Sequence, residues 1–303
     1  MENITVIVPF RHGTEPDRRH FPAGTVFSDD EGQGKKYALR KAVSAAATEY
    51  VWLTDDDTVL PAIVFAASES SGKPEKPDSP EDPFRPHNAD LLILPLNMQP
   101  GNGSLLERLQ QTEYAAIQSL TMLAAEHGRP VMCSGANLIV RRERWLESYA
   151  DLRPGLPGGD DMFLLESFKR RGLRIAVPDA DDCRWPAEAG AYTASVMPQP
   201  DLRGLLRQRM RWAGKAPHYT DRDIRLCGAA VVLLNLLAVV CPPCFVLKYL
   251  LDVWIIRRGR RYGIRCPHRM RRALLLSLIY PWYMLICLIG GIFLSFRKRE
   301  VSF

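Results

Sequence analysis

Three consecutive carboxylates, Asp55, Asp56 and Asp57, are the residues of this chain best suited to hold a cation. They follow the apolar run Val51–Leu53, which reads as a short buried strand. In an open α/β sheet, ligands bind beyond the carboxyl ends of the strands, and two acids on one short loop provide the hard oxygen ligands that Mg²⁺ and Mn²⁺ prefer. A cation held there would bridge to a diphosphate. The alternative is a solvated acidic turn that caps the next helix.

A second acidic pair, Asp160 and Asp161, follows two glycines and opens a segment, residues 162–171, that predicts a helix ending at Gly172. Acids at a helix N-terminus are an ordinary capping preference, because they complement the free N–H groups and the helix dipole. Capping is therefore one interpretation of this pair. The other is that it supplies a catalytic carboxylate.

A glycine also interrupts a strand-like run, at Gly135–Asn137 within residues 131–140. Glycine inside a strand suggests that the backbone approaches a ligand closely, although a bulge gives the same pattern.

The elements that must position these residues alternate between strand and helix, which predicts an α/β fold with a mostly parallel central sheet. The first strand, residues 4–9, ends at Pro9, and Arg11 follows at the end where a ligand would bind. The spacing of Ser104 and Glu107 predicts a capping box at the start of a long helix. The expected elements are strands at 25–27, 90–96 and 173–177, helices at 34–49, 62–68 and 104–127, and a mobile Pro-rich loop at 70–89.

Net charge separates the chain into two parts. Residues 226–303 contain twelve Lys and Arg against two acids, whereas residues 1–225 contain 28 basic and 32 acidic residues, so the overall charge of +6 comes from the tail. The tail also contains two uncharged apolar runs, residues 226–247 and 273–296. Each can cross a hydrocarbon core, which takes roughly 20 helical residues. Basic residues that flank apolar runs favour a membrane surface over nucleic acid as the partner.

We therefore predict a front domain over residues 1–225 and a membrane region with two to three apolar helices over residues 226–303. A basic helix at residues 202–219 is suited to lie along anionic headgroups, although a stop-transfer charge cluster would look the same. The chain has no Walker A or GxGxxG motif, so NTPase and dinucleotide functions lack their phosphate loop.

Eight arginines between residues 257 and 272 place that stretch in the cytosol by the positive-inside rule. Residues 226–256 must then cross the membrane an even number of times or not at all, which predicts a helical hairpin broken at Pro242 and Pro243. Its second arm, residues 244–256, would be about 20 Å long, so a re-entrant or interfacial helix is an equal alternative to a crossing. Pro281 predicts a kink. The N-terminus enters a strand without a basic leader, so we expect no signal peptide and a cytosolic front domain.

Taken together, these pieces resemble the family 2 glycosyltransferases, specifically the bacterial membrane-attached kind. The resemblance rests on six motifs in the family's order over residues 4–215. They are Val6–Pro9, Gly34–Leu39, Leu53–Asp57, Gly135–Asn137 followed by Arg141 and Arg142, Gly159–Asp161, and Gln208 with Arg211 and Trp212.

What the resemblance implies is an A-type glycosyltransferase fold that binds a nucleotide-diphosphate sugar with Mg²⁺ or Mn²⁺ and inverts the anomeric carbon in a single displacement. Asp55 and Asp57 match the DxD pair of metal ligands, with Asp57 as the direct ligand. Asp161 falls where the family's catalytic base sits, and Asp160 would orient it or the acceptor. The resemblance further implies donor- or diphosphate-binding roles for Pro9, Arg11, Asp29, Asp30, Lys35, Asp56, Gln208, Arg211 and Trp212, and acceptor or sugar contacts for Gly135, Ala136 and Asn137.

The resemblance also implies a hexosyltransferase at the bacterial inner membrane that takes part in envelope polysaccharide assembly. The expected partners are a nucleotide-diphosphate sugar, with a UDP-sugar favoured, a lipid-linked or glycan acceptor, and the membrane, but no nucleic acid.

One departure from the family concerns the region between Pro9 and Lys35, which holds only about 25 residues where the family has a full helix and a second strand. Either residues 25–30 form a contracted second strand, with Asp29 or Asp30 as the acid that reads the nucleotide base, or a βα unit is missing. A non-catalytic membrane scaffold that keeps the fold is therefore an alternative to an enzyme. A transporter subunit is a third alternative, but Asp252 is the only acid in the apolar region to serve one.

Overall fold

The computed structural model describes residues 4–61, 89–178, 192–266 and 269–300, and for residues 269–270 and 294–300 it describes the backbone alone. The expected helix at 62–68 and nearly all of the loop expected at 70–89 lie outside the described residues. The chain forms two compact units, and the division into a front domain over residues 1–225 and a membrane region over residues 226–303 stays a prediction. The first comprises residues 1–97, 121–196 and 260–264, and the second comprises residues 98–120, 197–259 and 265–303. Assignment of residues 226–303 to a membrane stays a prediction.

The first unit is built on a six-stranded sheet in the order β2-β1-β3-β7-β5-β8. Its strands are β1 (Ile4–Phe10), β2 (Val26–Asp29), β3 (Tyr50–Leu53), β5 (Leu91–Ile93), β7 (Leu138–Arg141) and β8 (Ile175–Ala176). The pairs β1–β2, β1–β3 and β5–β8 are parallel, whereas β7 runs antiparallel to both β3 and β5. The sheet is therefore mixed, which corrects the expectation of a mostly parallel sheet at this strand.

A hydrogen bond just outside the strands marks where the chain enters β7. The Leu94 N–H, one residue past the end of β5, donates to the Asn137 carbonyl one residue before β7, at 3.2 Å. The chain thus enters β7 at the edge of the sheet where β3 and β5 end. Because β7 is antiparallel to its neighbours, Gly135–Asn137 lies at the carboxyl edge of the parallel strands although it precedes its own strand.

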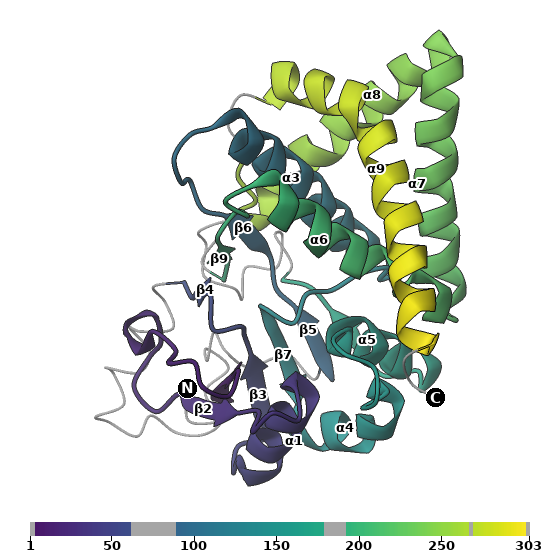
Figure 1. Ribbon diagram of the computed structural model, residues 1–303. Coiled ribbons are helices and arrows are strands. Elements are labelled where there is room, and N and C mark those ends of the chain that lie inside the picture. Colours follow the sequence, from purple (N-terminus) through teal and green to yellow (C-terminus); the bar gives the residue numbers. More distant parts are fainter. Residues whose placement is uncertain (1–3, 62–88, 179–191, 267–268, 301–303) are drawn as a thin grey trace. The chain divides into compact units, whose positions relative to one another are not determined.

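The helix α1 (Lys35–Ala45) packs against β1 and β2. It buries Ala38, Leu39, Ala42 and Val43, a stripe with the spacing of one helix face. Two further helices of this unit are α4 (Arg142–Glu147) and α5 (Asp160–Arg170), which Figure 1 shows with α1 around the strands. The largest fully buried side chains of the unit come from β3, α4 and α5: Trp52, Trp145, Phe163 and Phe168.

The connection between β1 and β2 is short and lacks a full helix in the described residues. β2 pairs in parallel with β1, with Phe10 opposite Asp29, and the described chain between them contains only the three-residue turn η1 (Arg18–His20). The contracted second strand, one of the two alternatives for residues 25–30, is therefore confirmed. The role of Asp29 or Asp30 toward the nucleotide base stays a prediction. Asp29 and Asp30 stand at the carboxyl end of that strand.

The single strand expected at residues 90–96 is in fact two strands in different sheets. β5 ends at Ile93, and β6 (Leu96–Met98) joins β4 (Thr58–Val59) and β9 (Ala194–Val196) in a three-stranded sheet of order β4-β9-β6. Pro95 separates the two, because proline cannot donate to a strand ladder.

The long helix α3 (Leu105–Glu126) contributes residues to both units. Its expected cap is present in part: the Glu107 N–H donates to the Ser104 hydroxyl at 3.2 Å. The Glu107 carboxylate, however, accepts from the backbone N–H groups of Gly101 and Gly103 rather than from that of Ser104. The Gly101 and Gly103 bonds also keep the pKa of Glu107 below its ordinary value.

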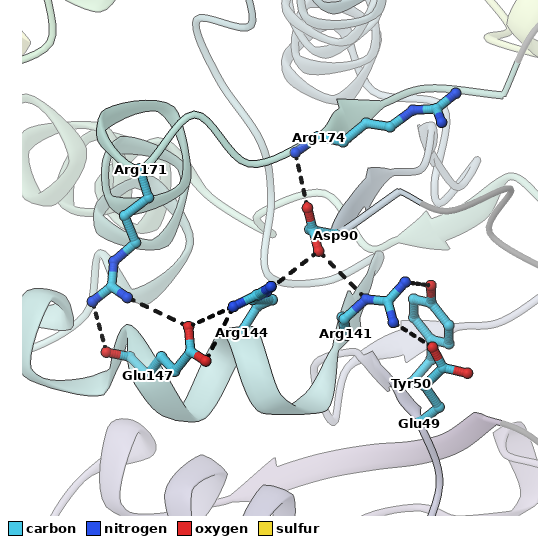
Figure 2. A network of polar contacts seen from close by, with 8 residues as sticks. All are labelled: Glu49, Tyr50, Asp90, Arg141, Arg144, Glu147, Arg171 and Arg174. Atoms are coloured by element: carbon cyan, nitrogen blue, oxygen red, sulfur yellow. Dashed lines mark hydrogen bonds and ion pairs between the residues drawn. The ribbon is translucent and has the colours of Figure 1, made fainter.

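A charged network stabilises the edge of the six-stranded sheet where β3, β5 and β8 begin (Figure 2). Asp90 accepts from the Arg174 N–H at 2.9 Å and lies 3.4 Å from Arg141 Nε and 3.6 Å from Arg144 Nε. Arg141 also pairs with Glu49 of the segment that enters β3. Asp90 thus ties the starts of β5 and β8 to the end of β7 and to α4.

The second unit consists mainly of helices. They are residues 105–120 of α3, α6 (Leu202–Ala213), α7 (Arg222–Val240), α8 (Pro242–Arg258) and α9 (Arg269–Glu300). The expected helix break at Pro242 and Pro243 is confirmed, since α7 ends at Val240 and both prolines open α8. By length and composition, Arg222–Val240 and Arg271–Phe293 are the two described stretches that could span a membrane, each with a mean hydropathy of 2.0. Pro281 lies within α9, and a kink there stays a prediction.

Candidate active site

The first acidic motif lies where β3 ends in the middle of the sheet. The Thr54 N–H still donates to the Ile7 carbonyl of β1, and the Thr58 N–H closes a turn onto the Asp55 carbonyl, both at 3.2 Å. The three acids between them therefore project from a tight turn at the carboxyl edge. The side chain of Asp55 is half-buried, and those of Asp56 and Asp57 are exposed.

Lys35 joins the two acidic motifs. Its ammonium donates to Asp55 Oδ1 at 2.5 Å and lies 3.2 Å from Asp160 Oδ2. The two carboxylates are thus within the reach of one ammonium group, although more than a hundred residues separate them in the sequence. Burial alone would lower the pKa of Lys35, but the charges of Asp160 and then Asp55 raise it overall, so this lysine stays protonated.

The second acidic motif occupies the N-terminus of α5. Gly159, with φ of 74°, lets the chain turn into the helix, and Asp160 and Asp161 are its first two residues. Asp161 Oδ2 accepts from the Gly135 N–H at 3.3 Å, and its Oδ1 accepts from the Met162 N–H at 2.8 Å. The pair thus lies in the first turn of α5, where acids complement the helix dipole, and Asp160 shares Lys35 with Asp55. A catalytic role for the pair stays a prediction.

The Gly135 backbone lies next to the Lys35 and Asp160 side chains. A Cβ atom at this position would lie 3.2 Å from Lys35 Nζ and 3.3 Å from Asp160 Oδ2. Any larger residue would therefore press on the lysine that joins the two motifs. The Gly135 backbone thus comes close to the Lys35 and Asp160 side chains, and a close approach to a ligand stays a prediction.

Asn137 has a structural position instead. Its side chain is fully buried, its Oδ1 accepts from the Trp52 indole N–H at 2.9 Å, and its amide donates to the carbonyls of Pro95 and Tyr192. These bonds use both amide hydrogens. Any sugar contact in this segment would therefore come from Gly135 or Ala136 rather than from the Asn137 side chain.

Although Asp56 and Asp57 reach solvent, the protein around their carboxylates removes part of their hydration. This desolvation, and then the charge of Asp55, raises the pKa of both residues. Such crowded acids favour a cation that would neutralise them. Among the described residues, no group of three or more His, Cys, Asp or Glu side chains could hold a metal ion by itself. The donors therefore fit a Mg²⁺- or Mn²⁺-type ion that takes one or two carboxylates here and its other ligands from a diphosphate and water.

A third set of polar residues lies at the ends of β1 and β2. The ring of His12 bonds to Asp29 Oδ2 at 2.9 Å, and the His12 N–H donates to Asp30 Oδ1 at 2.9 Å. The hydrogen bond and charge of Asp29 raise the pKa of His12 above its ordinary value. Pro9 lies within β1 opposite Ser28, and Arg11 is exposed just after the strand. In the sequence, His12 could have been recognised as a candidate because it follows the first strand directly, next to Arg11.

Lys36, the neighbour of Lys35, has a structural role that the sequence pattern did not indicate. Its ammonium donates to the carbonyls of Arg153 and Leu156, at 2.9 and 2.7 Å, and lies over the Phe163 ring. It therefore fixes the turn that leads into α5. No local signal separates its role from that of Lys35, because only the tertiary fold decides which of two adjacent lysines faces the acids.

Gln208, Arg211 and Trp212 belong to the second unit, where all three lie on α6. Arg211 is exposed and the Trp212 side chain is 37% exposed. Arg209 between them is buried, donates to Gln208 Oε1 at 2.6 Å, and stacks on the Trp212 ring at 4.1 Å. Arg209, which the sequence analysis did not single out, thus contacts two of the three motif residues, Gln208 and Trp212.

Residues 18–215 match the model of a protein family described as glycosyltransferase like family 2. No curated protein sequence matches the chain. Among solved structures, S. aureus TarS 1-349 in complex with UDP is 13% identical, with 98% of this chain and 91% of that one covered and a TM-score of 0.37. Glucosyl-3-phosphoglycerate synthase from Mycobacterium tuberculosis, in complex with Mn²⁺ and UDP-glucose, is 16% identical, with 70% and 77% covered and a TM-score of 0.32. At these TM-scores the overlap of the backbones is partial.

Proposed function

Because the chain belongs to glycosyltransferase family 2, we propose that it moves a sugar from a UDP-sugar to a membrane-presented acceptor, with inversion at the anomeric carbon. The family membership supports the coarser statement, a glycosyltransferase of the A-type fold that uses a nucleotide sugar. The acceptor, lipid-linked or glycan, and the place in envelope polysaccharide assembly are part of the proposal.

The observation that carries the proposal is the bridge from Asp55 through Lys35 to Asp160. It supports one site in which the metal-type acids and the catalytic-type acids act on the same substrate. In an isolated capping turn, the first acidic motif would have no reason to approach the second.

Asp55 and Asp57 are the residues that would hold the divalent cation. When bound, the cation neutralises the diphosphate as it leaves and so stabilises the charge that develops in the transition state. Lys35 sits beside Asp55 and offsets part of the negative charge of the three acids. Arg11 and Asp56 lie at the same sheet edge, where they would contact the donor.

Asp161 is the proposed general base, and Asp160 its orienting neighbour. Asp160 is occupied by Lys35, whereas the Asp161 oxygens accept from backbone N–H groups that fix the direction of the carboxylate. An acceptor hydroxyl must lose its proton as the new bond forms, and a carboxylate within about 3 Å can take it. The backbone of Gly135 and Ala136 would line the sugar.

Asp29 and Asp30 are proposed to read the nucleotide base from the end of β2. Gln208, Arg211 and Trp212 are proposed to contact the diphosphate and the acceptor from α6. A guanidinium matches phosphate oxygens with two parallel N–H groups, which makes Arg211 suited to the leaving diphosphate.

The purified chain in detergent should be tested with a panel of UDP-sugars, Mn²⁺ and a bacterial membrane-lipid extract as acceptor. Asp161→Asn should lower transfer by about 10²- to 10⁴-fold, the usual contribution of a general base, while UDP with Mn²⁺ still binds. Asp57→Asn should lose Mn²⁺-dependent UDP binding. Asp17→Asn, in an exposed acid that bonds to Arg19, is the matched control. Wild-type rates in Asp161→Asn would refute the assignment of the base.

A non-catalytic scaffold is the second candidate, and the contracted β1–β2 connection favours it. A lost helix in the nucleotide-binding half would weaken the donor site. UDP binding that depends on Asp57 would exclude this candidate, and its absence across the whole panel would favour it.

Attachment to the bacterial inner membrane, with the front domain in the cytosol, is also part of the proposal. Large apolar side chains are exposed along the described parts of α7, α8 and α9, among them Leu233, Val240, Leu250, Trp254, Trp282, Ile286 and Phe293. Exposed large apolar side chains on three neighbouring helices favour a lipid partner, and arginines flank these helices. The other face of α9 packs on α6, so lipid would contact α9 on one side only. Resistance to alkaline carbonate extraction would support membrane attachment, whereas release into the supernatant would exclude an integral association.

A further inference from the structure

The helix that carries Gln208, Arg211 and Trp212 touches α9 backbone to backbone. Figure 1 shows α6 beside α9 within the second unit. At the contact, a Cβ atom on Gly291 would lie 2.7 Å from both the Gly214 nitrogen and the Met210 carbonyl oxygen. Conversely, a Cβ atom on Gly214 would lie 2.8 Å from the Gly291 carbonyl oxygen. Real Cβ contacts are not this short, so the two chain segments can meet only because both residues are glycine.

The neighbouring glycine makes a different contact. A Cβ atom on Gly290 would meet the end of the Met210 side chain, with the methyl carbon at 2.7 Å and the sulfur at 2.8 Å. Methionine is flexible and can move aside. Gly291 faces backbone atoms, which can move only if the whole helix moves.

On another side, α6 is held by an ion pair with α3. Arg209 donates to Glu113 Oε2 at 2.8 Å, and both side chains are buried, at 6% and 5% exposure. Arg209 also bonds to Gln208 and stacks on Trp212. The rotation of α6 about its own axis is therefore fixed at two places, by Glu113 and by Gly291.

We propose that Gly291 of α9 and Glu113 of α3 are positioning residues that set the rotation of α6 and thereby the direction of Arg211 and Trp212. The inference rests on the proposed role of Arg211 at the leaving diphosphate. A rotated α6 would carry the exposed guanidinium away from the phosphate, and misplacement by about 1 Å can cost on the order of 10²-fold in rate.

The test compares three glycine-to-alanine variants of the full chain in the UDP-sugar transfer assay. Gly291→Ala should lower kcat/KM at least about tenfold, whereas Gly290→Ala should stay within about threefold because only Met210 must move. Gly228→Ala is the matched control, because this α7 glycine has no atom within 4 Å of the added Cβ.

A double-mutant cycle separates positioning from a general loss of structure. In a background that carries both Arg211→Ala and Trp212→Ala, Gly291→Ala should change kcat/KM by less than about twofold, since both groups that it positions are already gone. Additive losses, or equal rates for the Gly291 and Gly228 variants, would overturn the inference. If Gly291→Ala does not yield folded protein, Glu113→Gln, which keeps the side-chain size, replaces it in the same cycle. A wild-type chain without transfer would refute the proposed function instead.

Discussion

Replacement of Lys35 by methionine tests the bridge on which the site depends. Lys35→Met keeps the length of the side chain and removes its charge, which leaves Asp55 and Asp160 facing each other without compensation. A charge-assisted hydrogen bond contributes about 1.5–3 kcal/mol. The Lys35 and Asp55 side chains are 31% and 35% exposed, so solvent screening reduces the expected loss to about 1–2 kcal/mol. For a unit of this size that is a fall in Tm of roughly 2–8 °C.

The effect of Mn²⁺ on the Tm of Lys35→Met provides a second test of the same bridge. Without the ammonium, the acids repel one another more strongly, so Mn²⁺ should bind the variant more tightly and restore more of its Tm than it adds to the wild type. Transfer should fall even so, because Lys35 orients Asp160 as well. Thermal unfolding in detergent, with and without Mn²⁺, measures both effects.

Lys41→Met is the matched control for Lys35→Met. Lys41 lies on the same helix and pairs with Glu31, but both side chains are exposed, at 53% and 42%. Its replacement should leave Tm and the Mn²⁺ response as in the wild type. The reasoning fails if the two methionine variants unfold alike, or if Mn²⁺ stabilises Lys35→Met no more than the wild type.

Three further predictions concern other parts of the chain. Because its folded-state pKa is raised, His12 should contribute stability below its ordinary pKa of 6.5, and that contribution should vanish as pH rises through the folded pKa; NMR titration should show the raised pKa, and Asp29→Asn should return it toward 6.5. Asp90→Ala should destabilise the fold by about 1–3 kcal/mol in denaturant unfolding, more than Glu147→Ala does, because Asp90 is only 16% exposed and ties three arginines. EDTA should abolish UDP binding by the wild type, and Mn²⁺ should restore it; binding that persists in EDTA would contradict the cation site at Asp57.

The sequence predicted most of the elements around the site because their signals are local. The long α3 helix begins after Ser104, α7 ends before Pro242, and β3 ends at the acids, all as the pattern of apolar and capping residues indicates. The misjudged elements depended on distant partners. The apolar run at 90–96 reads as one strand, but Pro95 sends its two halves into different sheets.

For the candidate site, the sequence by itself determined which carboxylates and basic residues the chain offers, and it gave a family resemblance that the comparison supports at the level of the family. Only the tertiary structure decided that Lys35 rather than Lys36 faces the acids. The same holds for the hydrogen bond from the Trp52 indole to the buried Asn137 side chain, and for the contact of Gly291 with the backbone at the end of α6. The physical reason is that residue type and spacing fix local conformation, whereas contacts between segments a hundred residues apart depend on how strands pair and helices pack.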